Sequence, residues 1–453
     1  MGERLVGSDD GSNKIGQNGH LLRILGVGFG IAVTVGGTIG VGILRTPGMV
    51  AEQLGSPWLI TMIWVCGGLY ALLGTVFVAE LGTMLPQVGG WYVYARRAFG
   101  RYGGFLIGWS DWLAQSGALA YLAVAIGEFT AQLLERPDAT FEKSVAIATL
   151  LAFAALHWIG IRAGSWTQEL TSLLKALAFI AFVVICFAVG APPDSPAGTL
   201  RTPGFPAIFV AVVIALQSIV VTYDGWYSAI YFTEEDRDPG RNLPRSLIAG
   251  ILCTIGIYVL VNLALLYALP IQSLAASRLP AADVAANIFG PYGGRIITAL
   301  CILSLLSILN AVLLLTPRIL LAMGRDGLFW RRATSVNRGG TPDVAMVLST
   351  IAGILLVMSG TFEKLVAITS FFYVFIYTSG VVALFVLRRR EPGLRRPFHN
   401  WGHPWAPAIF LLGSFAFLIG SVWGDIENST YALALIAISY PLFGLLYRRK
   451  RSV

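Results

Sequence analysis

The stretch Gly36-Gly37-Thr38-Ile39-Gly40-Val41-Gly42 interrupts an apolar run that is centred near Val33. Glycine is about 1 kcal/mol less favourable than alanine inside a helix, so this cluster predicts that the helix unwinds locally. At membrane depth, unwound backbone is tolerated only where it lines protein or a water-filled cavity, because hydrocarbon offers N–H and C=O groups no partner. The segment therefore predicts an interrupted membrane helix beside a central cavity.

A second interruption is expected at Thr222-Tyr223-Asp224-Gly225-Trp226, in the apolar run centred near Ile214. The two clusters occupy the first and sixth apolar runs of the chain. This placement is typical of transporters in which spans one to five and six to ten are inverted repeats. Glycines that serve close helix packing would explain the first cluster alone, but they explain the pair less well.

Composition places both clusters in a membrane protein. Of the 453 residues, 56% are hydrophobic and 12% are charged, and the mean hydropathy is +0.72. A soluble domain carries roughly twice that share of charge. Apolar runs of about 18 residues or more predict bilayer-spanning helices, so we expect an all-α integral membrane protein with twelve transmembrane helices. The runs centre near Val33, Leu69, Leu119, Phe153, Phe182, Ile214, Tyr258, Leu306 and Leu355, cover 365–387 and 404–424, and end with one near Ile436.

The chain is predicted to form one transmembrane domain, 21–447, between a polar tail at 1–20 and a basic tail at 448–453. Within it, the repeats cover about 21–190 and 206–387, and about 404–447 adds two helices. Most Lys and Arg fall in connectors on one side, which places both termini in the cytoplasm and the protein in the cytoplasmic membrane. These connectors account for the net charge of +8 without a nucleic-acid partner. The Cys and His residues show no metal-binding spacing, and we expect neither a metal nor a cofactor.

Each interruption exposes main-chain groups that suit a zwitterion. The amides of Gly40, Val41, Gly42 and Ile43 would begin the second half of the first span, where the positive end of the helix dipole favours a carboxylate. Carbonyl groups near Thr38, and near Val221 or Asp224, would suit an ammonium group. Together they describe an α-amino acid, although a dicarboxylate, or a cation with an anion, could use the same groups.

Three ionisable residues lie well inside predicted spans, where a functional role is the default expectation. Lys175 follows the expected helix start by about nine residues, roughly 13 Å, too deep to reach either surface. It could carry a proton, replace a metal cation, or pair with a carboxylate to hold helices together. Asp224 could contact the substrate amine, pair with Arg45, or carry a proton. Arg45 could line an outer vestibule or be structural, whereas Asp111, Glu80, Glu128 and Glu169 are expected mainly to pack helices or fix topology.

Four segments in order resemble one family across nearly the whole chain: GGTIGVGILRTPG (36–48), AELGTMLPQVGGWYVYARRAFG (79–100), TYDGWYSAIYFTEEDRDPGRNLPRSL (222–247) and GRDGLF (324–329). The chain resembles the amino acid–polyamine–organocation permeases, and within them the bacterial relatives of L-type exchangers. This resemblance implies a LeuT-type 5+5 inverted repeat with broken helices 1 and 6. It also implies a substrate site, which we predict to comprise Thr38, Ile39, Gly40, Val41, Gly42, Ile43, Val221, Thr222, Tyr223, Asp224 and Trp226.

The resemblance also bears on coupling. Lys175, in TSLLKALAF, matches the lysine that occupies the place of a sodium ion in sodium-independent relatives. Ser304, Ser307 or Asn310 are its candidate partners, and we predict Lys175 with Ser307 as the coupling residues. Val221 stands where many relatives carry an aromatic gate, so Tyr223 and Trp226 are the candidates for closing the site instead. The segments 80–100 and 234–244 are expected to form an inner gate or a loop scaffold.

The resulting prediction is a secondary active transporter of α-amino acids that works by alternating access and is not an enzyme. It is expected to be sodium-independent, with proton coupling, exchange and oligomeric state left open. A permease-like sensor or channel is the alternative. A small or aliphatic neutral substrate is favoured, because no carboxylate pair for a cationic side chain is evident. The lipid bilayer is expected to surround the transmembrane domain.

Overall fold

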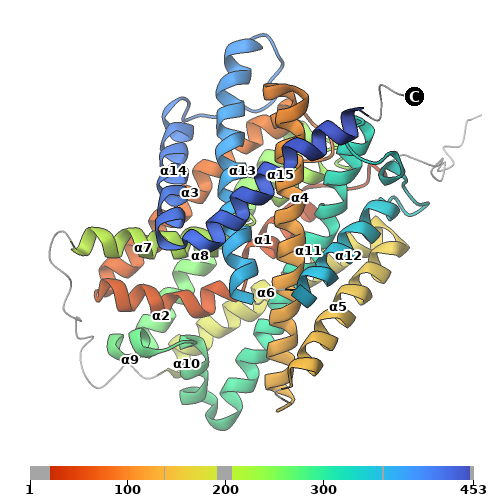
Figure 1. Ribbon diagram of the computed structural model, residues 1–453. Helices are drawn as coiled ribbons and strands as arrows, with labels where there is room; N and C mark the ends of the chain where they lie inside the picture. Colours follow the sequence, from red (N-terminus) through yellow and green to blue (C-terminus); the bar gives the residue numbers. More distant parts are fainter. Residues whose placement is uncertain (1–20, 137, 191–206, 360–361, 449–453) are drawn as a thin grey trace, which may run out of the picture.

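The computed structural model describes residues 21–136, 138–190, 207–359 and 362–448 (Figure 1). Within these ranges, the chain forms helices and their connections, with one isolated β-bridge between Leu25 and Asp236. The predicted all-helical class is confirmed. The predicted tails, 1–20 and nearly all of 448–453, lie outside the described residues, as does 191–206 between the predicted repeats.

Glycine, proline and a capping aspartate mark helix ends in the first half. Gly55 ends a helix with a left-handed φ of 62°, and Pro57 begins the next one, as these two residues commonly do. The Asp138 side chain accepts hydrogen bonds from the amides of Thr140 and Phe141, which caps the following helix. The helices are α1 (Val27–Thr38), α2 (Gly42–Leu54), α3 (Pro57–Met84), α4 (Trp91–Leu133), α5 (Ala139–Ile159) and α6 (Ile161–Val189).

The second half contains a short apolar helix, several long ones and short connecting helices. Pro239 and Pro280 each begin a helix, where the missing N–H costs nothing. In order, the elements are α7 (Ala207–Thr222), η1 (Ser228–Phe232), α8 (Pro239–Ala268), α9 (Ile271–Ala276), α10 (Pro280–Phe289), η2 (Gly290–Tyr292), α11 (Gly293–Arg325), η3 (Arg331–Thr334), α12 (Asp343–Ser359), α13 (Phe362–Arg390), α14 (Trp405–Gly424) and α15 (Ile426–Arg448).

The described residues contain eight helices that are long and apolar enough to cross a membrane. The pair α1 and α2 forms a ninth such span, bent by 46°. Two further apolar helices, α7 and α12, are shorter. A multi-spanning membrane protein is therefore confirmed. These helices account for nine to eleven spans, and a twelfth would require α4, which has 43 residues.

Both expected interruptions are present. Residues 39–41 separate α1 from α2, and we call them the first break. Residues 223–227 separate α7 from η1, and we call them the second break. Gly225 has a φ of +100°, which a residue with a side chain rarely adopts. In both places the backbone unwinds close to the positions that the glycine clusters predict.

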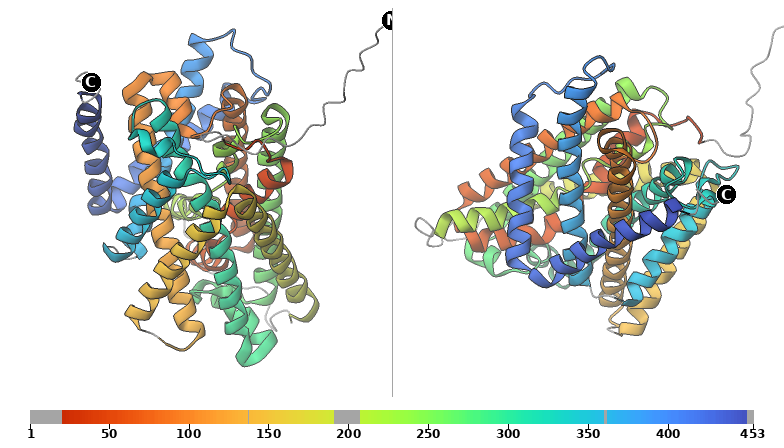
Figure 2. Two further views of the ribbon diagram at one scale, coloured as in Figure 1. Left: turned by 90° about the vertical axis from the view of Figure 1, so that its right-hand side faces the viewer. Right: turned by 45° about the horizontal axis from the view of Figure 1, so that its top comes forward.

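The two breaks lie among the best-packed helices. The first segment, α1, packs against α6, α8 and α11, while α4 packs against both α11 and α13 (Figure 1). In contrast, α5, α14 and α15 are mostly exposed along their apolar windows, and Figure 2 shows α15 at the edge of the molecule. Exposed apolar side chains on outer helices, such as Trp158 and Trp423, are expected to face lipid.

Candidate functional site

The end of α1 meets the second break backbone to backbone. A Cβ added to Gly225 would lie 2.5 Å from the Gly37 carbonyl oxygen, and one added to Gly37 would lie 2.9 Å from Ser228 Oγ. Such short distances require a shift of the backbone or the neighbouring side chain. Glycine at these positions therefore permits the close approach of α1 and the second break.

Lys175 satisfies carbonyl groups that the first break releases from the helical hydrogen-bond ladder. Its Nζ donates to the carbonyl oxygens of Gly36 at 2.7 Å and Ile39 at 2.6 Å. The Ser304 carbonyl oxygen is a third acceptor at 3.5 Å, and the Ser304 hydroxyl donates to the Ile39 carbonyl oxygen at 2.9 Å. The lysine side chain is fully buried. The Lys175 side chain thus joins α6, the end of α1 and α11 in the interior.

The start of α2 presents main-chain amides near the cavity described below. The amide of Leu44 donates to the Val41 carbonyl oxygen at 3.0 Å, so the first turn is formed there. The amides before it belong to the group that an α-helix leaves without a partner in its own ladder. Since α2 has thirteen residues, the positive end of its dipole adds to the attraction for an anion.

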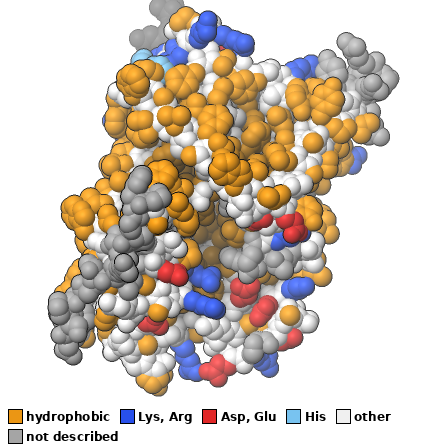
Figure 3. All heavy atoms as spheres, turned by 60° about the vertical axis from the view of Figure 1, so that its left-hand side comes forward, with side chains coloured by type: hydrophobic (Ala, Val, Ile, Leu, Met, Phe, Trp, Pro, Cys, Tyr) orange, Lys and Arg blue, Asp and Glu red, His pale blue; other side chains and the backbone are white. Residues whose placement is uncertain are grey.

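A cavity of about 980 Å³ lies against both breaks. Helices α4, α11 and α13 contribute to its wall through residues that include Tyr121, Ile308 and Tyr373, and α2, α7, α9, α14 and α15 contribute as well. Asp224, in the second break, lines it and accepts a hydrogen bond from Tyr377 of α13. Charged side chains, among them Arg45, Glu52, Glu128, Arg278 and Asp425, line its outer part. Figure 3 shows one face of the molecule hollowed, with charged side chains gathered below the hollow.

Buried acidic side chains tie η1 and the residues after it to neighbouring helices. The Tyr231 hydroxyl lies 2.8 Å from each carboxylate oxygen of Asp111 on α4. Glu235 forms a two-fold ion pair with Arg318 of α11 at 2.5 and 2.8 Å, and both side chains are almost fully buried. The Arg318 guanidinium also lies 4.5 Å from the centroid of the Phe232 ring. Specific polar contacts therefore fasten this part of the protein to α4 and α11.

Comparison with known proteins places this geometry in a family. A model of the family described as "Amino acid permease" matches residues 30–445. This chain belongs to the amino acid permease family. The resemblance that the four sequence segments indicated is therefore confirmed.

Three curated relatives of this permease have names that specify transport. It is 27% identical over 443 residues to the serine/threonine exchanger SteT of Bacillus subtilis, covering 96% of this chain and 99% of the relative. It is 26% identical over 451 residues to the human large neutral amino acids transporter small subunit 2, covering 97% and 84%. It is 25% identical over 382 residues to the human b(0,+)-type amino acid transporter 1, covering 83% and 78%. These relatives are transporters and not enzymes.

Not every residue predicted for the substrate site of this permease lines the cavity. Tyr223 is buried and donates to the Trp64 carbonyl oxygen at 3.2 Å. Trp226 is buried among aromatic rings that include Phe77 and Trp91. Neither ring lies in the cavity wall, and Val221, which is 41% exposed, offers no aromatic ring there. Of the predicted residues, those in the wall are Thr38, Gly40, Val41, Gly42, Val221, Thr222 and Asp224, while Ile39, Ile43, Tyr223 and Trp226 are not.

The structure selects Ser304 from the three candidate partners of Lys175. Ser307 lies one helical turn away and accepts a hydrogen bond from Thr171 at 3.2 Å. Asn310, nearly two turns away, bonds with His157 and Gln168 at 2.7 Å each. The hydrogen bonds of Lys175 thus include Ser304, whereas the coupling role of Ser307 stays a prediction. Helical register explains this contact, because Ser304 lies against both Lys175 and the Ile39 carbonyl oxygen.

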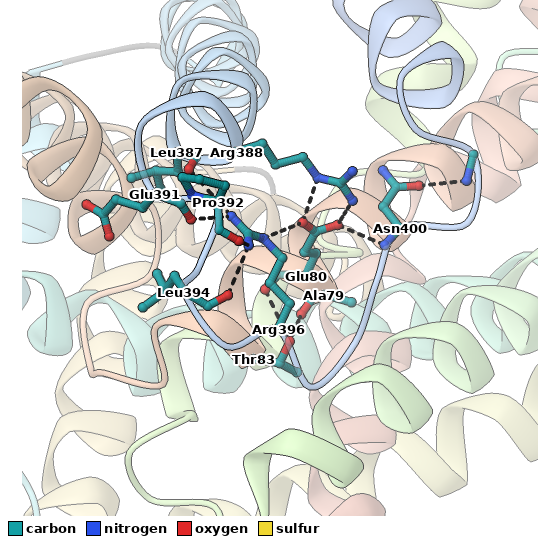
Figure 4. Close-up of polar contacts among 11 residues, drawn as sticks. Ala79, Glu80, Thr83, Leu387, Arg388, Glu391, Pro392, Leu394, Arg396 and Asn400 are labelled. Atoms are coloured by element: carbon teal, nitrogen blue, oxygen red, sulfur yellow. Dashed lines mark hydrogen bonds and ion pairs between the residues drawn. The ribbon is translucent and has the colours of Figure 1, made fainter.

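Glu80 was expected mainly to pack helices or to fix topology. In the structure it is the centre of a network of ion pairs and hydrogen bonds (Figure 4). Its fully buried carboxylate accepts two hydrogen bonds from Arg388, at 2.8 and 2.5 Å. Arg396 lies 3.3 Å from it, and the Asn400 amide donates to it at 2.8 Å. Glu80 therefore fastens α3 to the end of α13 and to the connector that follows.

Two tyrosines contact the site but are not among the residues predicted from the sequence. Tyr377 donates to Asp224 from α13, as described above. Tyr258, on α8, places its hydroxyl 2.9 Å from the Thr38 carbonyl oxygen and 3.0 Å from the Thr222 carbonyl oxygen. A polar group in the middle of an apolar run is a sequence signal for both, because buried tyrosine hydroxyls usually find a partner. Which partner each finds depends on the tertiary structure.

Proposed function

We propose that this permease is a secondary active transporter that moves α-amino acids across the cytoplasmic membrane by alternating access. The observation that carries the proposal is the meeting of two interrupted helices at one cavity. Amides at the start of α2 suit the substrate carboxylate, and the carbonyl groups at the ends of α1 and α7 suit its ammonium group. The names of the three relatives, which all specify amino-acid transport, support the same substrate class.

The span count in this proposal is twelve, with both termini in the cytoplasm. Helices α7 and α12 are apolar, and α7 together with η1 would make one interrupted span, as α1 and α2 do. Spans one to five would then repeat as spans six to ten, with α14 and α15 added, in a LeuT-type arrangement. The matching positions of the two breaks in the halves support the repeat.

Alternating access in this proposal opens the site first to one side and then to the other. The cavity wall includes Arg45 and Arg278, and Arg278 belongs to a connector expected outside the cell. The Glu235–Arg318 and Asp111–Tyr231 contacts close the route beyond the breaks. We assign the described state as open to the outside, and these contacts as the ones that must separate for release into the cytoplasm.

Transport is proposed to be sodium-independent. Lys175 Nζ lies within 2.7 Å of two carbonyl oxygens released at the first break, which are groups of the kind that coordinate sodium in broken-helix transporters. A fixed ammonium group there makes a metal ion unnecessary for holding α1, α6 and α11 together. Proton coupling and amino-acid exchange are both compatible with this arrangement, and the experiment below separates them.

The decisive test is counterflow into proteoliposomes loaded with one unlabelled amino acid at a time. We expect transient accumulation of labelled amino acid in sodium-free buffer, with protein-free liposomes as the control. Dependence on an imposed pH gradient without internal substrate would indicate proton coupling, and dependence on internal substrate would indicate exchange.

Two outcomes would favour the alternative functions. Amino-acid binding in a thermal-shift assay without any flux would indicate a sensor, because a ligand raises the melting temperature by mass action alone. Flux of label that never exceeds equilibration, whatever is loaded inside, would indicate a channel.

A further inference from the structure

Within the described ranges, Asp111 of α4 is a completely buried carboxyl group that no ion pair includes. Its hydrogen-bond partners are the Tyr231 hydroxyl, 2.8 Å from each carboxyl oxygen, and the Gln115 amide nitrogen at 3.4 Å. Glu80 and Glu235 are also completely buried, but each of them pairs with an arginine. Asp111 is therefore buried without the compensation that these two carboxylates have.

An ionised carboxylate at Asp111 would be poorly satisfied. A phenol has one proton, so Tyr231 can give one full hydrogen bond and not two, and an amide contact of 3.4 Å is long. Burying an unpaired charge costs so much free energy that such a group usually binds a proton instead. A neutral carboxyl group fits the contacts better, because its O–H can donate to the Tyr231 oxygen while the Tyr231 O–H donates to the other carboxyl oxygen.

Asp111 lies just behind the wall of the cavity. Gln115 and Tyr227 are part of that wall, and the Gln115 amide nitrogen is also 3.4 Å from the Tyr227 hydroxyl. The Gln115 amide oxygen accepts a hydrogen bond from Tyr373 of α13 at 3.1 Å. The groups around Asp111 from α4, η1, the second break and α13 are thus an amide and phenols. On α11, the guanidinium of Arg318 is engaged by the ion pair described above.

We propose that Asp111 is a proton-binding site, and that it holds its proton while the route to the cytoplasm is closed. This inference rests on the proposed function, in which the contact between Asp111 and Tyr231 separates for release into the cytoplasm. When the contact separates, water replaces the phenol and can hydrate a carboxylate. The carboxyl O–H bond then breaks, the proton passes to this water, and the carboxylate keeps the electron pair. Closing the route again requires the uptake of one proton.

Opening toward the cytoplasm is therefore linked to the release of a proton. Release of one proton makes the ratio of open to closed molecules rise by up to about tenfold per pH unit. Acid conditions should hold the permease closed to the cytoplasm, and alkaline conditions should favour opening. Asp111→Asn should remove this dependence, because its amide is neutral at every pH. The amide can donate an N–H to the Tyr231 oxygen and accept the Tyr231 O–H, so both contacts are kept.

The chain offers a matched control in Asp326. Its carboxylate also accepts a hydrogen bond from a phenol, that of Tyr92 at 2.7 Å. Unlike Asp111, it pairs with Arg96 at 2.6 Å, and its side chain is 37% exposed, so its charge is compensated without a proton. Asp326→Asn therefore removes a carboxylate that contacts a phenol, but not one that is buried and unpaired.

The first measurement tests whether a proton is bound. Infrared spectra are recorded for the detergent-solubilised wild-type protein, Asp111→Asn and Asp326→Asn. We expect the band of protonated carboxyl groups to lose intensity in Asp111→Asn and to keep its wild-type intensity in Asp326→Asn.

The second measurement tests the link to opening. Spin labels are attached through Arg237→Cys and Arg331→Cys, two exposed positions that follow η1 and α11, after the exposed Cys66 and Cys253 are replaced by alanine. The distance between the labels then reports the separation of the segment after η1 from the end of α11. We expect the open fraction to rise with pH in the wild-type protein and in the control variant, and to stay low at every pH in Asp111→Asn.

Several results would overturn the inference. An infrared band that is unchanged in Asp111→Asn is one, and a pH response of this variant equal to that of the wild type is another. The wild-type protein alone also decides, whether or not the variant folds: no band of protonated carboxyl groups, or an open fraction that does not vary with pH, would contradict the proposal. Failure of the proposed function would look different, because the wild-type protein would then neither bind nor exchange amino acids, whatever these two measurements give.

Discussion

The Nζ atom of Lys175 and the carbonyl oxygen of Ile39 are 2.6 Å apart, in the interior of a chain that otherwise buries few charges. Ile39 belongs to the first break, so the lysine supplies the hydrogen bond that the interrupted helix cannot. The contact is part of the reason that unwound backbone is tolerated here. It also means that the conformation of the first break depends on a side chain from α6.

Replacing Lys175 tests this dependence. Lys175→Ala should lower the initial rate of counterflow by more than about tenfold, because charge-assisted hydrogen bonds contribute roughly 1.5–3 kcal/mol each and two are lost. Lys364→Ala is the control, because Lys364 lies above the Tyr431 ring and not at the first break. This variant should change the rate little. Wild-type rates with a wild-type pH profile in Lys175→Ala would refute the role.

Gly42→Leu should block substrate binding. A Cβ at this position would already lie 3.0 Å from the Thr222 side chain, so a leucine must project into the space between α2 and the end of α7. Gly28→Leu is the matched control, since nothing lies within 4 Å of a Cβ there. Amino-acid affinity measured by thermal shift should disappear in the first variant and persist in the second. Equal affinity in both would remove the carboxylate site from the start of α2.

Asp224 and Tyr377 should behave as one unit. Because the phenol donates to the carboxylate across the cavity wall, Asp224→Asn and Tyr377→Phe each disturb the same contact. We expect each to reduce counterflow, and the double variant to be little worse than the more damaging single one. Fully additive losses in a double-mutant cycle would show that the two residues act separately.

Glu235→Gln should destabilise the protein more than a change at a surface pair. Removing one partner from a buried ion pair costs about 3–5 kcal/mol, whereas an exposed pair contributes at most about 1 kcal/mol. Glu391→Gln is the control, because its partner Arg97 has a side chain that is 52% exposed. Melting temperatures in detergent should separate the two variants clearly. Similar shifts would mean that Arg318 finds another partner and that the pair does not close the route.

The sequence predicts some features of this permease well because they are local. Four glycines between Gly36 and Gly42 disfavour helix by themselves, and the first break lies among them. Asp224 reaches the cavity because it belongs to the second break. Such features can be predicted from the energetics of a few neighbouring residues in a bilayer.

Other features depend on contacts between distant parts of the chain. Glu80 and Arg388 are 308 positions apart, and no local pattern joins them. The choice of Ser304 over Ser307 is decided by the rotation of α11 about its axis, which apolar periodicity does not fix in a helix that is apolar over most of its surface. Tyr223 and Trp226 are predicted for the substrate site because they belong to the second interruption. In the structure, their large rings pack into the aromatic core instead.

The ion pair between Glu80 and Arg388 fixes one end of α13 to α3. If this end of α13 stays anchored, a tilt of the helix would displace its other end most. Tyr377 lies on the anchored half and Thr369 on the sweeping half, and both line the cavity. A tilt about the Arg388 end would therefore move Thr369 further than Tyr377, and so change the entrance more than the contact with Asp224.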